Sequence, residues 1–319
     1  MTLLISDLPK AYSDNIGAAV FRVSFEGRST VIARAVEALQ TKPALVFSSQ
    51  RADKLAKDNL GILLSLNTGA SNLRLDGKDP LQLADRISEV KSLCESAIPH
   101  GRIIIDITCF RREELLILMR VLSGLERRLW RSCELLYVSA ASMAEDWLSR
   151  NTVEYRSVIG YSGQPSPAKR SHLIVMVGFE VERARDIIAN YEPAKLTIGY
   201  GRQAESINTP LYHRNVHFFE QLKSLYGADV DSFDFSLTDP LKAAREILAV
   251  ISKTPDMINI VAPLNNKIST IGAGLVGISK KEVQICYGVV SEYNVKSYSK
   301  VGDKVYRFNL ADLLEAGLV

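Results

Sequence analysis

The chain has 319 residues, a hydrophobic fraction of 47%, a charged fraction of 24% and a formal net charge of +3 at pH 7. This composition is ordinary for a soluble globular protein. The net charge is too small to indicate nucleic-acid binding, although a basic cleft can exist within a balanced total. The length favours two domains of roughly 150 residues each.

The first half of the chain alternates short apolar segments with longer amphipathic ones. Helical spacing of apolar residues favours helices over 29–39 and 113–125. Another helix is expected to begin at Asp79-Pro80, because Asp is a strong N-cap and Pro fits the first helical position. The expected strands are 19–23, 44–47, 73–75, 103–107 and 135–138.

The second half repeats this alternation, with a matching helix start at Asp239-Pro240. Its expected strands are 173–177, 195–198, 232–235, 258–261 and 283–287. Continuous apolar strands separated by helices indicate parallel sheets that are covered on both faces. The predicted fold class is therefore α/β, with two tandem Rossmann-like lobes and mostly parallel sheets.

The two halves also match residue by residue at five places, in the same order and at offsets of 150 to 160 positions. The matched pairs are Phe25-Glu26 with Phe179-Glu180, Pro43 with Pro193, Asp79-Pro80 with Asp239-Pro240, 103–106 with 258–261, and Tyr137 with Tyr287. Each copy is long enough to be a domain of its own. The sequence therefore predicts an internal duplication, with a functional surface where the two lobes meet.

A Gly/Ser/Pro cluster at 160–167 is the expected linker. Lobe one is accordingly predicted to span 1–160, and lobe two 168–319. The tail of lobe two is predicted to hold a short β-hairpin, made of 295–298 and 305–308 around a Gly302-Asp303 turn, and a closing helix at 311–318.

The four cysteines form no Cys-x-x-Cys pair, which disfavours a zinc ribbon and a redox motif. Residues 1–7 lack the basic segment and long apolar run of a signal peptide. No apolar run approaches the ~20 residues that span a bilayer. A cytoplasmic protein is therefore expected.

Ligands of open parallel sheets collect beyond the carboxyl ends of the strands. In lobe one, Asp106 ends a strand, and Thr108 is expected to cap the helix that follows. The free amides of that helix, with Arg111 and Arg112, could hold a phosphate. The alternative is that Asp106 and Thr108 only cap, and that the arginines are a solvated first turn.

The equivalent turn of lobe two carries Asn265, Asn266, Lys267 and Ser269 before a helix rich in small residues. Asparagine amides can read a base edge, and a lysine can meet a phosphate as a point charge. The alternative is an ordinary turn with an asparagine cap. Arg202 follows another strand end and is a further phosphate candidate.

The loops after the first strand of each lobe share the dipeptide Phe-Glu, as Phe25-Glu26 and Phe179-Glu180. Neither loop is a G-x-G-x-x-G or P-loop motif. The pair either brackets a base or forms a staple and capping pair. A third pattern, His213-x-x-x-His217-x-x-Glu220, has helical spacing, but exposed helix histidines are common and no metal site is assigned.

The turn Asn265-Asn266-Lys267-x-Ser269, after a strand and before a small-residue helix, resembles the ligand motif of CARF domains, and the tandem lobes are similar to SAVED domains. Asparagines stand here where that family usually has glycines, and lobe one lacks the lysine. The resemblance implies binding of a cyclic oligonucleotide or related nucleotide in a prokaryotic antiviral system.

The sequence thus predicts a nucleotide-binding sensor or regulatory subunit, with no catalytic residue and no cofactor assigned. Arg111, Arg112, Arg202 and Lys267 are expected to meet phosphates, and Asp106, Asn265 and Asn266 bases or ribose. A partner protein or a homo-oligomer is expected to receive the signal; no motif indicates nucleic acid, and no membrane is expected. Two alternatives remain: a nucleotide hydrolase or ribosyl transferase that uses Asp106 or Glu180, and an inert scaffold subunit.

Overall fold

The computed structural model describes residues 2–12, 15–50, 53–97, 101–227 and 229–317. The chain divides into two compact units. The described residues of the first unit lie in 1–114, 121–143 and 295–316, and those of the second in 115–120, 144–294 and 317.

The first unit is built on a seven-stranded sheet with the order β1-β13-β6-β5-β2-β3-β4. Its strands are β1 (Thr2–Leu4), β2 (Ile16–Arg22), β3 (Leu45–Ser49), β4 (Ser71–Leu75), β5 (Arg102–Asp106), β6 (Cys133–Met143) and β13 (Ser299–Asn309). The strands from β6 to β4 in this order are parallel, while β13 runs antiparallel to both β6 and β1.

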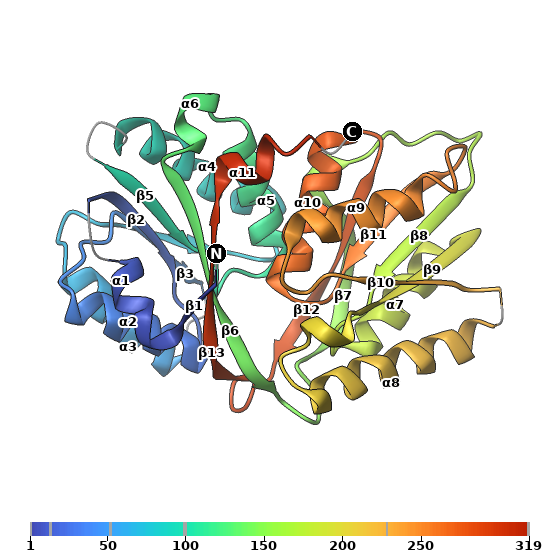
Figure 1. Ribbon diagram of the computed structural model, residues 1–319, viewed down its shortest axis with the longest axis horizontal. Helices are drawn as coiled ribbons and strands as arrows, with labels where there is room; N and C mark the ends of the chain where they lie inside the picture. Colours follow the sequence, from blue (N-terminus) through green and yellow to red (C-terminus); the bar gives the residue numbers. More distant parts are fainter. Residues whose placement is uncertain (1, 13–14, 51–52, 98–100, 228, 318–319) are drawn as a thin grey trace. The chain divides into compact units, whose positions relative to one another are not determined.

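Helices cover both faces of this sheet, with α2 and α3 on one face and α4 on the other (Figure 1). The helices of this unit are α1 (Leu8–Ala11), α2 (Gly27–Ala38), α3 (Lys54–Ser65), α4 (Pro80–Ala97), α6 (Arg127–Trp130) and α11 (Leu310–Leu314). Helix α5 (Arg112–Ser123) is divided, because its residues 115–120 belong to the second unit. The apolar run Ile103–Ile105 is fully buried between these layers. The Asp79 carboxylate accepts the Leu81 and Gln82 amides at the start of α4, as the Asp-Pro pair predicts.

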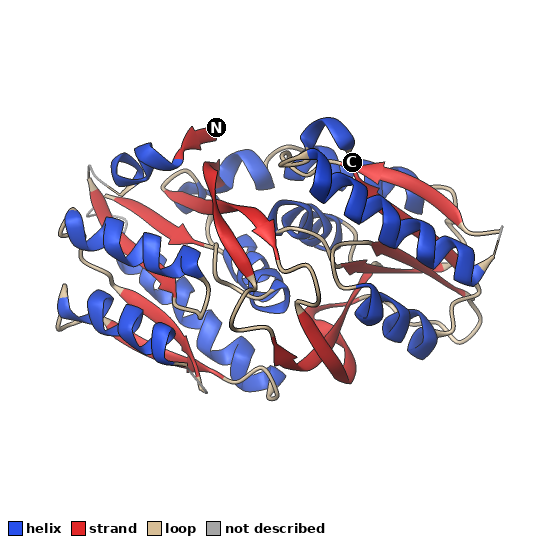
Figure 2. Ribbon diagram, turned by 90° about the horizontal axis from the view of Figure 1, so that it is seen from below, coloured by secondary structure: helices blue, strands red, loops and turns tan. Residues whose placement is uncertain are grey.

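The second unit is built on a six-stranded sheet with the order β10-β9-β8-β11-β12-β7. Its strands are β7 (Ser149–Ser162), β8 (Ser171–Met176), β9 (Lys195–Gly201), β10 (Asp231–Phe235), β11 (Ile258–Pro263) and β12 (Gln284–Tyr293). Its helices are α7 (Val181–Tyr191), α8 (Thr209–Tyr226), α9 (Pro240–Ile251) and α10 (Lys267–Ser279). All pairs are parallel except β7 with β12. Figure 2 shows the same layering of strands and helices in this unit.

The two sheets share the same topology over six strands, and the first sheet has one further strand, β1, beside β13. Numbered along each unit, the five parallel strands lie in the order 3-2-1-4-5, with one antiparallel strand beside the fifth. This is the strand order of a Rossmann fold. The predicted fold class and the predicted duplication are both confirmed.

The antiparallel strands change units. Strand β7 follows β6 in the chain but pairs with β12, and β13 follows β12 but pairs with β6. Consequently residues 149–160 lie in the second unit and 295–316 in the first, which differs from the predicted boundaries at 160 and 168.

The predicted C-terminal hairpin is wrong. Strand β13 continues through Gly302-Asp303, and residues 295–298 are not a strand. The pairing of β13 with β6 shifts register between Val301 and Val305, so the Gly-Asp pair marks a bulge and not a turn. A Cβ at Gly302 would lie 2.4 Å from Ser139 Oγ, so glycine is required by this close approach.

Within the described residues, no helix has the length and apolar character needed to cross a membrane.

Candidate ligand-binding site

Each sheet has one topological switch point, where the strand order reverses between its first and fourth parallel strands. This point lies between β2 and β5 in the first unit and between β8 and β11 in the second. Ligands of open α/β sheets bind at the carboxyl ends of such strands. The loops after β5 and β11 begin at these points, and they carry most of the predicted site residues.

A buried polar cluster forms around the loop after β2, which borders the switch point of the first unit. Glu26 and Arg28, from the loop after β2 and the start of α2, form an ion pair, with Arg28 Nε 3.1 Å from Glu26 Oε2. Ser299, the first residue of β13, donates to the same carboxylate at 2.8 Å. The guanidinium also lies 5.9 Å from the ring centre of Tyr137 and donates to Val138 O at 3.0 Å.

The second unit repeats this cluster. Arg183 pairs with Glu180 at 3.2 Å and lies 4.5 Å from the ring centre of Tyr287. Ser149, the first residue of β7, donates to Glu180. Both ion pairs are almost fully buried. We call the four residues of each unit the Glu-Arg-Tyr-Ser cluster.

The surroundings of both arginines favour the charged form. Burial opposes it, but the Glu26 carboxylate raises the pKa of Arg28 above its ordinary value. At Arg183, burial is likewise outweighed, and Tyr287 and Glu180 raise the pKa.

The capping interpretation of the two glutamates is wrong. Glu26 and Glu180 stand at the N-cap positions of α2 and α7, but neither side chain accepts a helix amide. Each carboxylate is instead held by the arginine and serine of its cluster. Two helix N-termini at the switch points are thereby left without a side-chain cap.

Asp106 and Thr108 are buried inside the first unit, with exposed fractions of 2% and 0%. The Tyr12 hydroxyl and the Thr108 amide donate to the Asp106 carboxylate. Burial raises the pKa of Asp106, and these hydrogen bonds oppose the shift. Thr108 does not cap α5, as was expected, because its hydroxyl accepts the Val138 amide at 2.9 Å and the helix begins later, at Arg112.

The N-terminus of α5 already holds a carboxylate where a phosphate was predicted. Glu114 accepts the Arg111 amide at 2.8 Å and pairs with Arg22 at 3.1 Å through both Nε and Nη2. Burial opposes ionisation, but the Arg22 and Arg111 charges lower the pKa of Glu114. Arg111 and Arg112 are half-buried at this helix start. Sequence reasoning missed Arg22, whose only signal is a charge at the end of an apolar strand.

In the second unit, the amides of Asn265 and Asn266 bind backbone. Asn265 donates to Val177 O at 2.6 Å, and Asn266 donates to Leu237 O at 2.8 Å. The Asn266 side chain also accepts the Ser269 amide, which makes it the N-cap of α10. The interpretation as an asparagine-capped turn is therefore confirmed for Asn266. Ser269 is fully buried.

Close packing holds the loops after β8 and β11 together. A Cβ at Gly178 would lie 2.0 Å from Leu264 O, so only glycine fits there. Asn215 of α8, which sequence reasoning missed, donates to Val177 O and Gly178 O and accepts the Gly201 amide. Lys267 is half-buried at the start of α10.

Arg202 is occupied by carboxylates of its own unit. Its guanidinium lies 2.7 Å from Asp234, 2.6 Å from Glu246 and 3.3 Å from Glu205. Three carboxylates around one guanidinium disfavour a further role in phosphate binding.

His213, His217 and Glu220 do not assemble a metal site. Across the described part of the chain, no group of three or more histidine, cysteine, aspartate or glutamate side chains is placed to hold a metal ion. His217 instead forms a hydrogen bond with Gln221 at 3.1 Å.

Comparison with known proteins gives little support for any identity. No family model and no curated protein matches the chain. One solved structure with some similarity is a C2-type ketoreductase from a modular polyketide synthase, with 13% identity and a TM-score of 0.20. The match covers 83% of this chain and 66% of that one. The strand order alone therefore carries the Rossmann-like assignment.

Proposed function

We propose that this protein binds a nucleotide-type ligand at the carboxyl ends of its parallel strands and acts as a sensor or regulatory subunit. The observation that carries the proposal is the Glu-Arg-Tyr-Ser cluster at both switch points. Burying an ion pair adds little to stability compared with apolar residues of the same volume. Its presence in both units points to a role beyond stability.

The cluster prepares a helix N-terminus for an anion. Each glutamate is turned away from the amides of α2 or α7 by its arginine, so these amides have no side-chain cap. The first helix after the first strand is also where dinucleotide-binding folds hold a pyrophosphate. The two arginines sit at different positions in their helices, Arg28 second and Arg183 third, yet each reaches its glutamate.

Ligand binding is favoured over catalysis because the candidate carboxylates are engaged. Glu180 pairs with Arg183, and Asp106 accepts hydrogen bonds from Tyr12 and Thr108. A general base needs access to its substrate. The resemblance of 265–269 to CARF motifs supports a cyclic or linear oligonucleotide as ligand. A cytoplasmic location, an antiviral setting and output to a partner protein or a homo-oligomer belong to the same proposal.

The test is a calorimetric and thermal-shift screen of the purified chain against linear and cyclic nucleotides. A ligand at ~100 times its dissociation constant stabilises the protein by roughly 2.7 kcal/mol. Lys267→Ala is expected to weaken binding, while Lys281→Ala, at an exposed lysine of the same unit, serves as the matched control. Binding that is absent across the panel, or equal in both variants, contradicts the proposal.

A scaffold subunit is the second candidate, and one observation favours it. The side chains of Arg202, Asn265 and Asn266 form ion pairs or hydrogen bonds with residues of their own unit. A scaffold predicts no nucleotide binding and co-purification of a partner that survives Lys267→Ala.

A further inference from the structure

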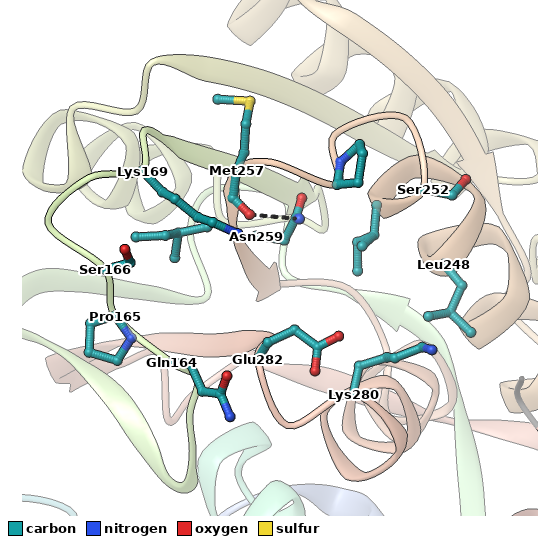
Figure 3. Close-up of a pocket in the computed structure, with 13 residues that line it drawn as sticks. Gln164, Pro165, Ser166, Lys169, Leu248, Ser252, Met257, Asn259, Lys280 and Glu282 are labelled. Atoms are coloured by element: carbon teal, nitrogen blue, oxygen red, sulfur yellow. Dashed lines mark hydrogen bonds between the residues drawn. The ribbon is translucent and has the colours of Figure 1, made fainter.

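A cavity of about 620 Å³ opens at the amino ends of β8 and β11 (Figure 3). The switch point lies at the other, carboxyl ends of the same strands. The volume of the cavity is in the range of ligand-binding pockets. The end of α9 gives Leu248 and Ser252, the start of β11 gives Met257, and the turn between α10 and β12 gives Lys280 and Glu282.

The loop before β8 forms the remaining wall and is held in place by backbone contacts. The Gln164 amide donates to Glu282 O, and the Lys169 amide donates to Ser166 O at 3.1 Å. Gly163 has φ +66°, and a Cβ there would lie 2.9 Å from Glu282 O. Because a side chain would be strained and crowded at Gly163, glycine allows this loop to reach the α10–β12 turn.

Asn259, which lines the cavity, belongs to a buried, uncharged hydrogen-bond network behind it. His172 Nδ1 forms a hydrogen bond with Asn259 Oδ1 at 2.9 Å, and its Nε2 forms one with the Thr197 hydroxyl at 2.7 Å. The Asn259 amide donates to Thr254 O at 3.2 Å and to Met257 O at 3.4 Å, the second of which is drawn in Figure 3. Burial lowers the pKa of His172, which keeps the ring neutral. Asn259 is therefore held by three hydrogen-bond partners at the cavity wall.

The charges at the rim are unpaired. Among the described residues, the side chains of Lys169, Lys280 and Glu282 have neither an ion-pair nor a hydrogen-bond partner. Two cations and one anion beside an apolar wall of Leu248 and Met257 leave a net positive charge at the mouth. Such a site attracts an anion whose body can cover the apolar wall.

We propose that this cavity is a second binding site, which takes a small organic anion with an apolar or aromatic body. Lys169 and Lys280 would meet its phosphate or carboxylate group, and Leu248 and Met257 its apolar body. Glu282 would accept a hydrogen bond from a hydroxyl or amine of the same molecule. This site is separate from the proposed nucleotide site, so each can fail without the other.

The test is a fluorescence titration of the whole chain with 8-anilinonaphthalene-1-sulfonate, an aromatic anion. Saturable binding is expected, and Lys280→Glu should weaken it by about tenfold, since it replaces attraction with repulsion at close range. Lys281→Glu is the matched control, because this exposed neighbour carries the same charge but does not line the cavity. Glu282→Gln should tighten binding, because it removes the one negative charge.

A second pair of variants tests the volume and not the charge. Ser252→Trp should fill the mouth and abolish binding, while Ser252→Ala should leave it unchanged. Because Ser252 is exposed, neither substitution should disturb the fold, and circular dichroism checks this. The proposal is overturned if Lys280→Glu behaves like Lys281→Glu, or if the Trp variant binds the probe as well as the Ala variant does.

Discussion

At the residue scale, the buried ion pair Arg22–Glu114 gives a prediction for stability. Both side chains are 2% exposed. Arg22→Met would leave a buried carboxylate without its cation, and we expect the free energy of unfolding to fall by about 3–5 kcal/mol. Urea denaturation at pH 7 measures this loss. Arg34→Met, at the exposed pair Arg34–Glu37, should cost about 0–1 kcal/mol.

The double replacement Arg22→Met with Glu114→Met separates loss of a pair from loss of packing. It removes both charges at similar volume, so most of the lost stability should return. If Arg22→Met lowers the free energy of unfolding no more than Arg34→Met does, the pair Arg22–Glu114 is not buried in solution.

Glu205 gives a prediction for the dependence of stability on pH. Burial opposes its ionisation, but hydrogen bonds from Ser236, the Leu237 amide and Thr238 lower its pKa to about 2. A lowered pKa stabilises the fold above the unfolded-state value, near 4.5, and this contribution is lost as pH falls through about 2. Glu205→Gln should therefore cost about 1–2 kcal/mol at pH 7, after allowance for solvent screening.

The measurement is thermal unfolding of the two proteins from pH 7 down to pH 2. Their difference in stability should be constant above about pH 5.5 and should shrink below pH 4.5. Glu182→Gln, at a glutamate that is 70% exposed, should differ little from the parent at any pH. A constant Glu205→Gln difference down to pH 2 would contradict the assignment.

Residue types at strand ends could be predicted from the sequence, but their partners could not. Asp106 and Asn266 are correctly predicted to lie at or after the ends of strands, because a strand pattern followed by a polar turn is local. The partner of Asp106, Tyr12, is 94 positions away, and that of Glu114, Arg22, is 92 away. The choice of partner for each charged residue depends on tertiary packing, which a local sequence pattern does not contain.

At the element scale, the parallel strands and the Asp-Pro helix starts follow from local pattern, and the last strand shows where pattern fails. Alternating residues around Gly302-Asp303 fit a hairpin turn and a strand bulge equally well. The bulge forms because β13 pairs with β6, which lies about 160 positions earlier in the chain. Pairing over such a distance is not visible in a short segment.

Two glycines of the first unit should respond to substitution with opposite sign. Gly302→Ala places a Cβ 2.4 Å from Ser139 Oγ and 3.0 Å from the Ser139 backbone, so we expect a loss of about 1–3 kcal/mol. Gly61→Ala, in the middle of α3, has no atom within 4 Å of the new Cβ and should gain about 0.5–1 kcal/mol. Chemical denaturation measures both. Equal effects at the two positions would mean that the bulge does not hold Gly302 against Ser139.

At the scale of the whole molecule, each unit completes its sheet with a strand that follows the other unit's parallel strands. The first residue of that strand, Ser299 in β13 and Ser149 in β7, also completes the Glu-Arg-Tyr-Ser cluster. Neither unit is therefore a continuous piece of chain. The polar cluster at each proposed ligand site depends on the strand that arrives from the other half.

This dependence predicts how the two halves behave when they are made separately. Residues 1–162 contain β7 but lack β13, and residues 163–319 contain β13 but lack β7. Each half then has an unpaired edge on β6 or β12 and a strand that its own sheet does not use, which favours exchange between chains. We expect each half alone to aggregate or to form strand-exchanged dimers, and the co-expressed halves to give a 1:1 complex by light scattering.

Ser149→Ala and Ser299→Ala should weaken that complex, because each removes the hydroxyl that joins the exchanged strand to its glutamate. If each half is instead a folded monomer, β7 can pair with β6 and β13 with β12, and the exchange is a property of the joined chain alone.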